Sequence, residues 1–240
     1  GSEEGLNNAN IFTIEQNSNG LMYFTTANGI YYYDGYTFTK LDIDSLKSNA
    51  LLSMTIQDRD QLYLSISEEG IARYSLKSGS YELLNHLKSA GHNSDNFIIT
   101  ETFAYLLTTR IKLLMVDLKS NRLIQDELRK KNESDVPNCL YKTKDSRILV
   151  GRNSGLYEIQ NGKQVKLNFF GNSAVYSICE SNKGKMYIGS SGKIVVVNNQ
   201  TLESEITPAF NTRSATFLPG GEKSITKLVV DEYGRLWFTS

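Results

Sequence analysis

The chain has 240 residues, 40% of them apolar, and its 26 basic and 26 acidic residues give a formal net charge of zero. Proteins that bind nucleic acid or an anionic membrane need a basic surface, so this balance argues against both classes. No run of eighteen apolar residues occurs, and no membrane-spanning helix is predicted. Gly1-Ser2 is typical of a cloning scar, and one domain is expected over 3–240.

The segment 10–41 predicts four consecutive β-strands. Its apolar runs are short, rich in Tyr, Ile and Phe, and bounded by Gly, Asn and Asp, as in strands joined by hairpin turns. The expected strands are 11–16, 21–26, 29–35 and 36–41. Successive side chains of a strand point to opposite faces, so the tyrosines of this segment should alternate between the two faces of the sheet. Its aromatic richness is therefore interpreted mainly as packing.

The same four-strand unit recurs along the chain. Further units are predicted at 49–85, 96–125, 137–168 and 174–206, and half a unit at 224–240. The second strand of each unit supplies an anchor residue: Tyr23, Tyr63, Leu106, Leu149, Tyr187 and Trp237. The anchor spacings of 40, 43, 43, 38 and 50 residues fit the period of four-stranded propeller blades. A long loop over 203–223 accounts for the widest spacing.

These units predict an all-β fold, a β-propeller of four-stranded blades with about five and a half blades. Neighbouring blades would cover the second strands on both faces, which explains why these strands are apolar throughout instead of alternating. An open ring would expose sheet edges to unwanted pairing. We therefore expect the 240 residues to be an excerpt of a seven-bladed propeller. Closure by a partner chain or by an atypical C-terminal strand is the alternative.

Cys139 and Cys179 are the two cysteines, and each lies in a stretch of alternating apolar residues. Two cysteines are too few for a disulfide framework. Neither has a neighbouring Cys or His at the spacing of metal ligands. Both are predicted to be small buried core residues, with a disulfide as the alternative.

The segment 5–41 resembles the repeat of the two-component regulator propeller family. Part of that repeat reads roughly I-x-x-D-x-x-G-x-L-W-I-G-T-x-x-G-L-x-R-Y-D-G-x-x-F. Matching residues here include Ile14, Gly20, Tyr23, Thr26, Gly29, Ile30, Tyr33, Asp34, Gly35 and Phe38. DEYGRLWFTS at 231–240 also matches well, the units at 137–168 and 174–206 match more loosely, and those at 49–85 and 96–125 depart furthest.

The resemblance implies a role in sensing. Members of that family form the periplasmic sensor region of hybrid or classical sensor histidine kinases in Gram-negative bacteria that degrade glycans. The chain would then bind an oligosaccharide from polysaccharide breakdown and relay it to transcriptional control. The implied partners are a second propeller and downstream domains of the same parent chain, which would be anchored in the inner membrane and dimeric at full length. No nucleic acid is expected at this segment.

The residues give little support to catalysis. Sialidase-like propellers carry S-x-D-x-G-x-T-W turns, of which DEYGRLWF keeps the Gly-to-Trp spacing alone. Streptogramin-lyase-like propellers use a histidine and an acidic residue around magnesium, but His86 and His92 lie together in an irregular joint at poor metal-ligand spacing. Paired carboxylates such as Glu68-Glu69 lie in predicted turns. We expect no catalytic residue, no metal and no cofactor in this segment.

A ligand-binding rim is expected at the loops between blades and at the loops between second and third strands. Sugars are recognised by aromatic faces and by amide or guanidinium groups. The candidates are Asn28, Arg110, Arg152, Asn153, Phe169, Phe170, Asn172, Arg213 and Phe217. NFFGN at 168–172 is preferred, because two adjacent aromatics cannot both point into one core face of a strand. The alternative is that one ring packs between blades and the other caps the joint.

Two other functions stay open. One is a non-catalytic interaction scaffold that holds a protein on the propeller rim. The other is a streptogramin-lyase-like enzyme, which would need a divalent cation held by a histidine and a carboxylate.

Overall fold

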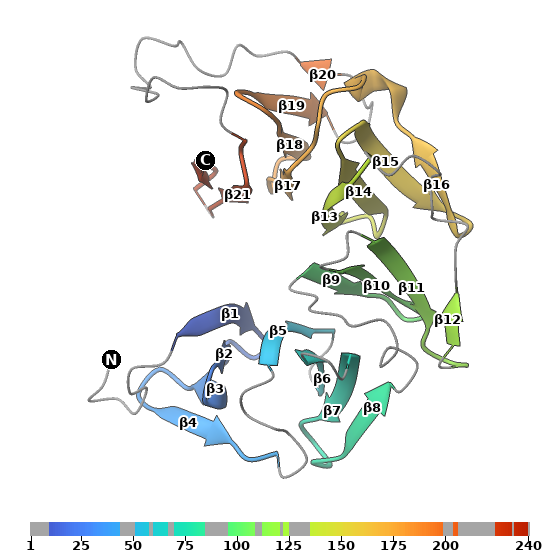
Figure 1. Ribbon diagram of the computed structural model, residues 1–240. Coiled ribbons are helices and arrows are strands. Elements are labelled where there is room, and N and C mark those ends of the chain that lie inside the picture. Colours follow the sequence, from blue (N-terminus) through green and yellow to red (C-terminus); the bar gives the residue numbers. More distant parts are fainter. Residues whose placement is uncertain are drawn as a thin grey trace. The chain divides into compact units, whose positions relative to one another are not determined.

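The computed structural model describes residues 10–43, 51–57, 60–66, 70–84, 96–108, 112–120, 122–124, 135–198, 204–205, 224–231 and 233–239. The chain divides into two compact units, 1–125 and 126–240, and each is described by itself. Both units are built from antiparallel β-sheets (Figure 1). Among the described residues, no helix is long and apolar enough to cross a membrane.

The first unit contains three four-stranded sheets, coloured blue to light green in Figure 1. Blade 1 consists of β1 (Ile11–Gln16), β2 (Met22–Thr26), β3 (Gly29–Tyr33) and β4 (Phe38–Leu41). Blade 2 consists of β5 (Leu51–Ile56), β6 (Gln61–Ile66), β7 (Gly70–Ser75) and β8 (Tyr81–Leu84). Blade 3 consists of β9 (Asn96–Ile99), β10 (Phe103–Thr108), β11 (Lys112–Asp117) and β12 (Arg122–Ile124). In each blade the strands pair in chain order.

The second unit contains two more four-stranded sheets and a two-stranded one. Blade 4 consists of β13 (Pro137–Lys142), β14 (Ile148–Arg152), β15 (Gly155–Gln160) and β16 (Lys163–Lys166). Blade 5 consists of β17 (Ser177–Glu180), β18 (Lys185–Gly189), β19 (Ile194–Asn198) and β20 (Ser204–Glu205). The sixth sheet pairs β21 (Lys227–Val230) with β22 (Leu236–Thr239). The predicted fold, a β-propeller of four-stranded blades with about five and a half blades, is confirmed.

Within each unit, successive blades pack through their first strands and bury the faces of their second strands. Strand β5 contacts β1, β2 and β9, and β17 contacts β13 and β21. On β6, Leu62 and Leu64 are buried in the cluster shared with blade 1, whereas Tyr63 is buried in the cluster shared with blade 3. The second strand is thus covered on both sides, which explains its unbroken apolar sequence.

The anchor residue of blade 3 is Tyr105, and the predicted anchor Leu106 was wrong by one position. Leu106 packs in the cluster between blades 2 and 3, on the face of blade 3 that meets the preceding blade. Tyr63 and Tyr187 lie on the opposite face of their own blades, toward the following sheet. Tyr105 is buried on the face of blade 3 opposite to that of Leu106, because neighbours in a strand point to opposite faces. Blade 3 lacks the turn glycines of other units, so spacing alone left its register uncertain by one residue.

The tyrosines of blade 1 alternate between the two faces, as predicted. Tyr23 and Tyr32 lie in the cluster shared with blade 2, with their ring centroids 6.2 Å apart. Tyr33 lies on the other face, where its ring centroid is 4.6 Å from that of its cross-strand partner Phe38. The aromatic residues of this stretch therefore serve mainly in packing within and between blades.

The motif residue that follows the first strand of a blade has a structural role. Asn17 and Asp231 occupy this position in blade 1 and in the sixth sheet. Asp231 Oδ1 accepts a hydrogen bond from the Arg235 backbone N–H at 2.8 Å, and its Oδ2 accepts one from the Trp237 indole at 3.0 Å. These bonds, led by that of Trp237, lower the pKa of Asp231 to about 2. The segment DEYGRLWF, which has the Gly-to-Trp spacing of a sialidase turn, thus forms an Asx turn that is stabilised by Asp231.

Two glycines of the second unit allow close approach of the connector that enters the next sheet. A Cβ added to Gly151 would lie 2.6 Å from Val175 Cγ1 and 2.9 Å from the Val175 carbonyl oxygen. A Cβ added to Gly189 would lie 2.8 Å from the Ile225 carbonyl oxygen and 2.9 Å from its Cγ2. Since protein interiors are close-packed, neither site can accept a methyl group without displacing backbone.

Replacing either glycine by alanine should destabilise the second unit. Overpacking of this kind costs about 1–3 kcal/mol. Urea unfolding of Gly151→Ala and Gly189→Ala would measure the loss. Lys183→Ala, an exposed turn site of blade 5, is the control and should stay within about 0.5 kcal/mol of the unmodified protein. Unchanged stability of Gly151→Ala would contradict the close approach.

Candidate functional site

Five of the predicted binding residues come together at one end of blade 4. They are Arg152, Asn153, Phe169, Phe170 and Asn172. Two of them lie at the turn 152–155 between β14 and β15, and the other three lie in the connector 167–176 that leads to β17. The turn and the connector touch, because a Cβ on Gly155 would lie 2.6 Å from the Gly171 carbonyl oxygen. These two segments are called the blade 4 rim below.

The remaining candidates do not join this rim. Asn28 lies in the first unit, at the turn between β2 and β3, where it is exposed and its backbone N–H donates to Thr26 Oγ1 at 3.1 Å. Arg110, Arg213 and Phe217 lie outside the described residues, as do His86, His92 and the pair Glu68-Glu69.

The Arg152 side chain is buried and its hydrogen bonds tie three segments together. Its Nε donates to Asp135 Oδ2 at 3.1 Å, its Nη1 to Gln164 Oε1 at 2.9 Å and its Nη2 to the Asp135 carbonyl oxygen at 2.6 Å. The Arg152 and Asp135 side chains are 6% and 8% exposed. A guanidinium engaged in this way would shape a binding site by holding the rim in place.

Asp135 completes this network from the chain segment that enters β13. Its Oδ1 accepts a hydrogen bond from the Ser154 backbone N–H at 2.9 Å. Burial acts to raise the pKa of the Asp135 carboxyl, but the bonds from Ser154 and the positive charge of Arg152 outweigh burial and lower that pKa. The carboxylate is therefore charged at neutral pH and fixes the position of the turn 152–155.

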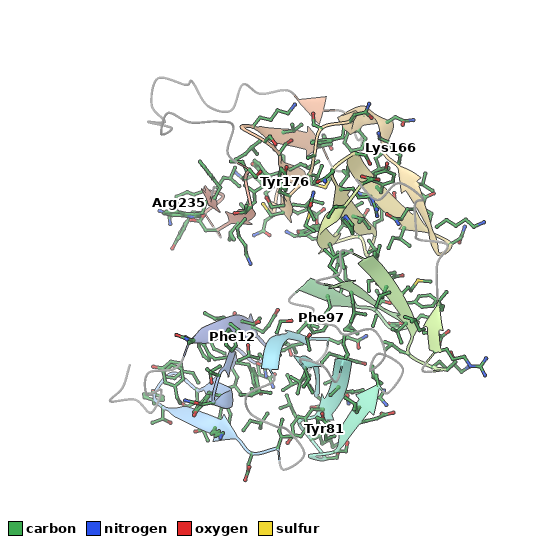
Figure 2. All side chains as sticks on the ribbon, viewed as in Figure 1. Phe12, Tyr81, Phe97, Lys166, Tyr176 and Arg235 are labelled. Carbon is green, nitrogen blue, oxygen red and sulfur yellow. The ribbon has the colours of Figure 1, made fainter. Side chains whose placement is uncertain are left out.

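The buried Tyr157 side chain contacts residues of the blade 4 rim and Lys166. The ring is buried, and its hydroxyl is 2.8 Å from Ser154 Oγ. Arg152 Cζ lies 5.9 Å and Lys166 Nζ 6.0 Å from the ring centroid, within the range of cation–π contacts. The Lys166 ammonium also donates to Asn172 Oδ1 in the connector, and Figure 2 shows Lys166 at the end of β16.

A β-bulge directs Asn138 to the same rim. The register of β13 shifts between Pro137 and Cys139, so that Asn138 leaves the regular alternation of the strand. Its Nδ2 donates to Asn153 Oδ1 at 3.0 Å and to the Val175 carbonyl oxygen at 3.1 Å. Asn138 thereby links the turn of blade 4 to the connector that enters blade 5.

Sequence reasoning missed Asn138, Tyr157 and Lys166. A signal for Asn138 was available. The same bulged position holds apolar residues in blades 1 and 2, Phe12 and Leu52, so the polar Asn138 breaks the apolar pattern at this position. Tyr157 and Lys166 carry no such signal. They meet because they are directly opposite each other in the pairing of β15 with β16.

Phe169 and Phe170 lie in a short 3₁₀ helix (Asn168–Phe170), not in a strand. Both rings are half-buried and pack against the apolar cluster shared by blades 4 and 5. The strand argument that favoured this pair does not apply to a 3₁₀ turn, whose side chains do not alternate between two faces. Each ring combines a packing role with a partly accessible face.

Neither cysteine is available for chemistry in the folded state. Cys139 and Cys179 are both free and buried, which confirms the prediction of core residues. Burial raises the pKa of the Cys139 thiol to about 12, and burial followed by the charge of Glu180 raises that of Cys179 to about 11. In the part of the chain that the structure describes, no group of three His, Cys, Asp or Glu residues could hold a metal ion.

No family model matches this chain, and no curated protein matches it. Solved structures do match. The extracellular domain assigned to the hybrid two-component system BT4673 from B. thetaiotaomicron is 22% identical, with a TM-score of 0.67 over 98% of this chain and 31% of that chain. The extracellular domain assigned to the hybrid system BT3049 from the same organism is 16% identical, with a TM-score of 0.65 over 99% of this chain and 33% of that chain.

A third similar structure belongs to a protein of another kind. PorZ, a surface component of the type-IX secretion system of Porphyromonas gingivalis, is 10% identical, with a TM-score of 0.68 over 95% of this chain and 37% of that chain. The chain spans about a third of the length of each of these three solved chains. At such identities the likeness establishes the propeller fold and leaves the activity to be argued from the rim.

Removing the charge of Asp135 should destabilise the fold strongly. Asp135→Asn leaves Arg152 buried without its counter-ion, which costs about 3–5 kcal/mol. Asp145→Asn is the matched control, since Arg147 Nε contacts Asp145 Oδ2 at 2.9 Å but Asp145 is 56% exposed. Exposed pairs contribute at most about 1 kcal/mol. Urea unfolding of both variants at pH 7 would measure the difference, and equal losses would contradict a buried structural pair.

The same substitution should change the acid sensitivity of the protein. The pKa of Asp135 is lower in the folded chain than the value of about 3.9 expected when unfolded. Its carboxylate therefore stabilises the fold above that unfolded pKa, and the contribution is lost as pH falls through the folded pKa. Unfolding free energies measured from pH 6 to pH 2 should fall less steeply for Asp135→Asn.

Both thiols should resist modification until the protein unfolds. With pKa values of about 12 and 11, almost no thiolate forms at pH 8, and burial blocks access. Ellman's reagent at pH 8 should detect no thiol in the native protein and both thiols in guanidinium chloride. Prompt labelling of the native protein would contradict the buried positions.

Proposed function

We propose that the chain is an extracytoplasmic ligand-sensing module of a two-component sensor histidine kinase. It binds an oligosaccharide from polysaccharide breakdown and relays this binding to transcriptional control. The main support is the likeness, over nearly the whole chain, to extracellular domains assigned to two hybrid two-component systems. The repeat at 5–41, which resembles that of two-component regulator propellers, points the same way.

The proposal includes the setting of the parent protein. The module would lie in the periplasm, joined to a second propeller and to downstream domains of the same chain. The parent would be anchored in the inner membrane and would act as a homodimer. This segment itself would carry no catalytic residue, and the kinase activity would belong to the downstream domains.

The blade 4 rim has the mixture of groups that sugar recognition uses. Asn153 and Asn172 place exposed amides on either side of the contact between turn and connector. Phe169 and Phe170 offer partly accessible rings that could cover the C–H face of a sugar. The buried Arg152–Asp135 pair and the Asn138 bonds hold these groups in place. A rigid rim lowers the entropic cost of binding, because few side chains must be ordered.

A screen of oligosaccharides would test this proposal. A ligand should raise the melting temperature of the protein, and Asn172→Ala should weaken binding about fivefold, the value of one hydrogen bond of about 1 kcal/mol. Asn19→Ala, an exposed amide at the β1–β2 turn, is the control and should bind as the unmodified protein does. Thermal shift would detect binding and isothermal titration would measure affinity. Absence of any shift across neutral and acidic oligosaccharides would contradict the proposal.

The likeness to PorZ favours a second candidate, a non-catalytic scaffold that holds a protein partner on its rim. PorZ matches this fold as well as the sensor domains do, and it is described as part of a secretion system. Affinity purification of the tagged protein from its native host separates the two candidates. A stoichiometric protein partner, together with no response to sugars, would favour the scaffold.

A further inference from the structure

Two lysines from adjacent blades converge on one stretch of the connector. Lys166 at the end of β16 donates its ammonium to Asn172 Oδ1, and Lys193 in the β18–β19 turn donates its ammonium to Ser173 Oγ at 3.2 Å. Asn172 and Ser173 are consecutive residues. Two positive charges from different blades therefore flank a single short piece of backbone.

Neither ammonium is paired with an acid among the described residues. Both bond to neutral side-chain oxygens, and within the described part of the chain neither lysine forms an ion pair. The segments 152–155, 167–176 and 190–193 contain no Asp or Glu. The nearby carboxylate of Asp135 is already balanced by Arg152. Among the residues that the structure describes, these two positive charges beside the connector therefore have no acidic partner.

The same stretch has further donors. Across the described residues, the backbone N–H groups of Asn172, Ser173 and Ala174 donate to no acceptor. Asn172 is exposed and Ser173 is half-buried, so these groups lie near the surface. Lys166 is also held in place by its cation–π contact with the buried Tyr157 ring. Fixed cations beside unpaired N–H groups are the arrangement that binds an anion.

We propose that this stretch, residues 172–174 between Lys166 and Lys193, binds an anionic substituent of a sugar, either a carboxylate or a sulfate. The inference rests on the proposed function and specifies the class of oligosaccharide. On binding, each lysine exchanges a neutral acceptor for an anionic one, which adds a Coulombic attraction between opposite charges to the hydrogen bond. A neutral sugar would offer no such exchange, so the two lysines would select acidic glycans over neutral ones.

The test compares matched charged and neutral oligosaccharides on the full chain. Tetragalacturonate is paired with its fully methyl-esterified form, and a κ-carrageenan tetrasaccharide is paired with its desulfated form. These pairs distinguish a carboxylate from a sulfate. In at least one pair the charged member should bind about tenfold or more tightly than its neutral partner, and less tightly as salt is raised.

Lysine variants test whether the preference for charged oligosaccharides comes from Lys166 and Lys193. Lys166→Gln and Lys193→Gln should each weaken binding of the charged member about threefold to tenfold and leave its neutral partner unaffected. Lys183→Gln, an exposed lysine at the other end of blade 5, is the matched control and should bind normally. Thermal unfolding of each variant checks that the fold is retained.

The outcomes separate this inference from the function on which it rests. If neutral oligosaccharides bind and neither charged probe binds more tightly than its partner, the inference is wrong and the sensor proposal stands. If charged probes bind equally to the Lys166→Gln, Lys193→Gln and unmodified proteins, the location is wrong. If no oligosaccharide of either kind binds, both proposals fail.

Discussion

The architecture depends on burying the second strand of an inner blade on both of its faces. On β6, Leu62 and Leu64 face one neighbouring blade and Tyr63 faces the other. Every residue of β14 is buried. Positions in the middle of a blade are therefore committed to apolar packing and cannot bind a ligand. Polar chemistry is confined to strand ends, turns and connectors.

The same packing makes the rim rigid. Connectors must pass close to the strand ends they cross, and Gly151 and Gly189 allow this because they lack a Cβ. The buried Arg152–Asp135 pair then fixes the turn beyond β14 against the segment that enters β13. Such a pair adds little net stability compared with apolar packing, because both charges lose their hydration. Its effect here is to specify one position of the turn, which a binding site needs.

Local sequence signals predicted the four-strand repeat well. They predicted poorly those features that depend on the exact pairing of strands. Period, strand composition and turn residues such as Asn17 and Asp231 are encoded within a few residues, so the four-stranded blades followed from sequence. The predicted anchor of blade 3 was Leu106 instead of Tyr105, because blade 3 has no turn glycine from which to fix the register. At the rim, Arg152 and Asn172 were predicted as loop residues. Tyr157 and Lys166 meet only through cross-strand pairing, which no short motif records.

Fold likeness alone does not choose between a sensor and a scaffold. PorZ at 10% identity and the BT4673 domain at 22% have nearly equal TM-scores, 0.68 and 0.67. The choice must come from the rim. A stable protein partner buries about 800 Å² on each side and relies on apolar anchors. The blade 4 rim instead offers amides and half-buried rings on a short turn and connector. Lys166 and Lys193, which have no acidic partner among the described residues, flank the connector, and together these groups suit a small, polar and negatively charged ligand.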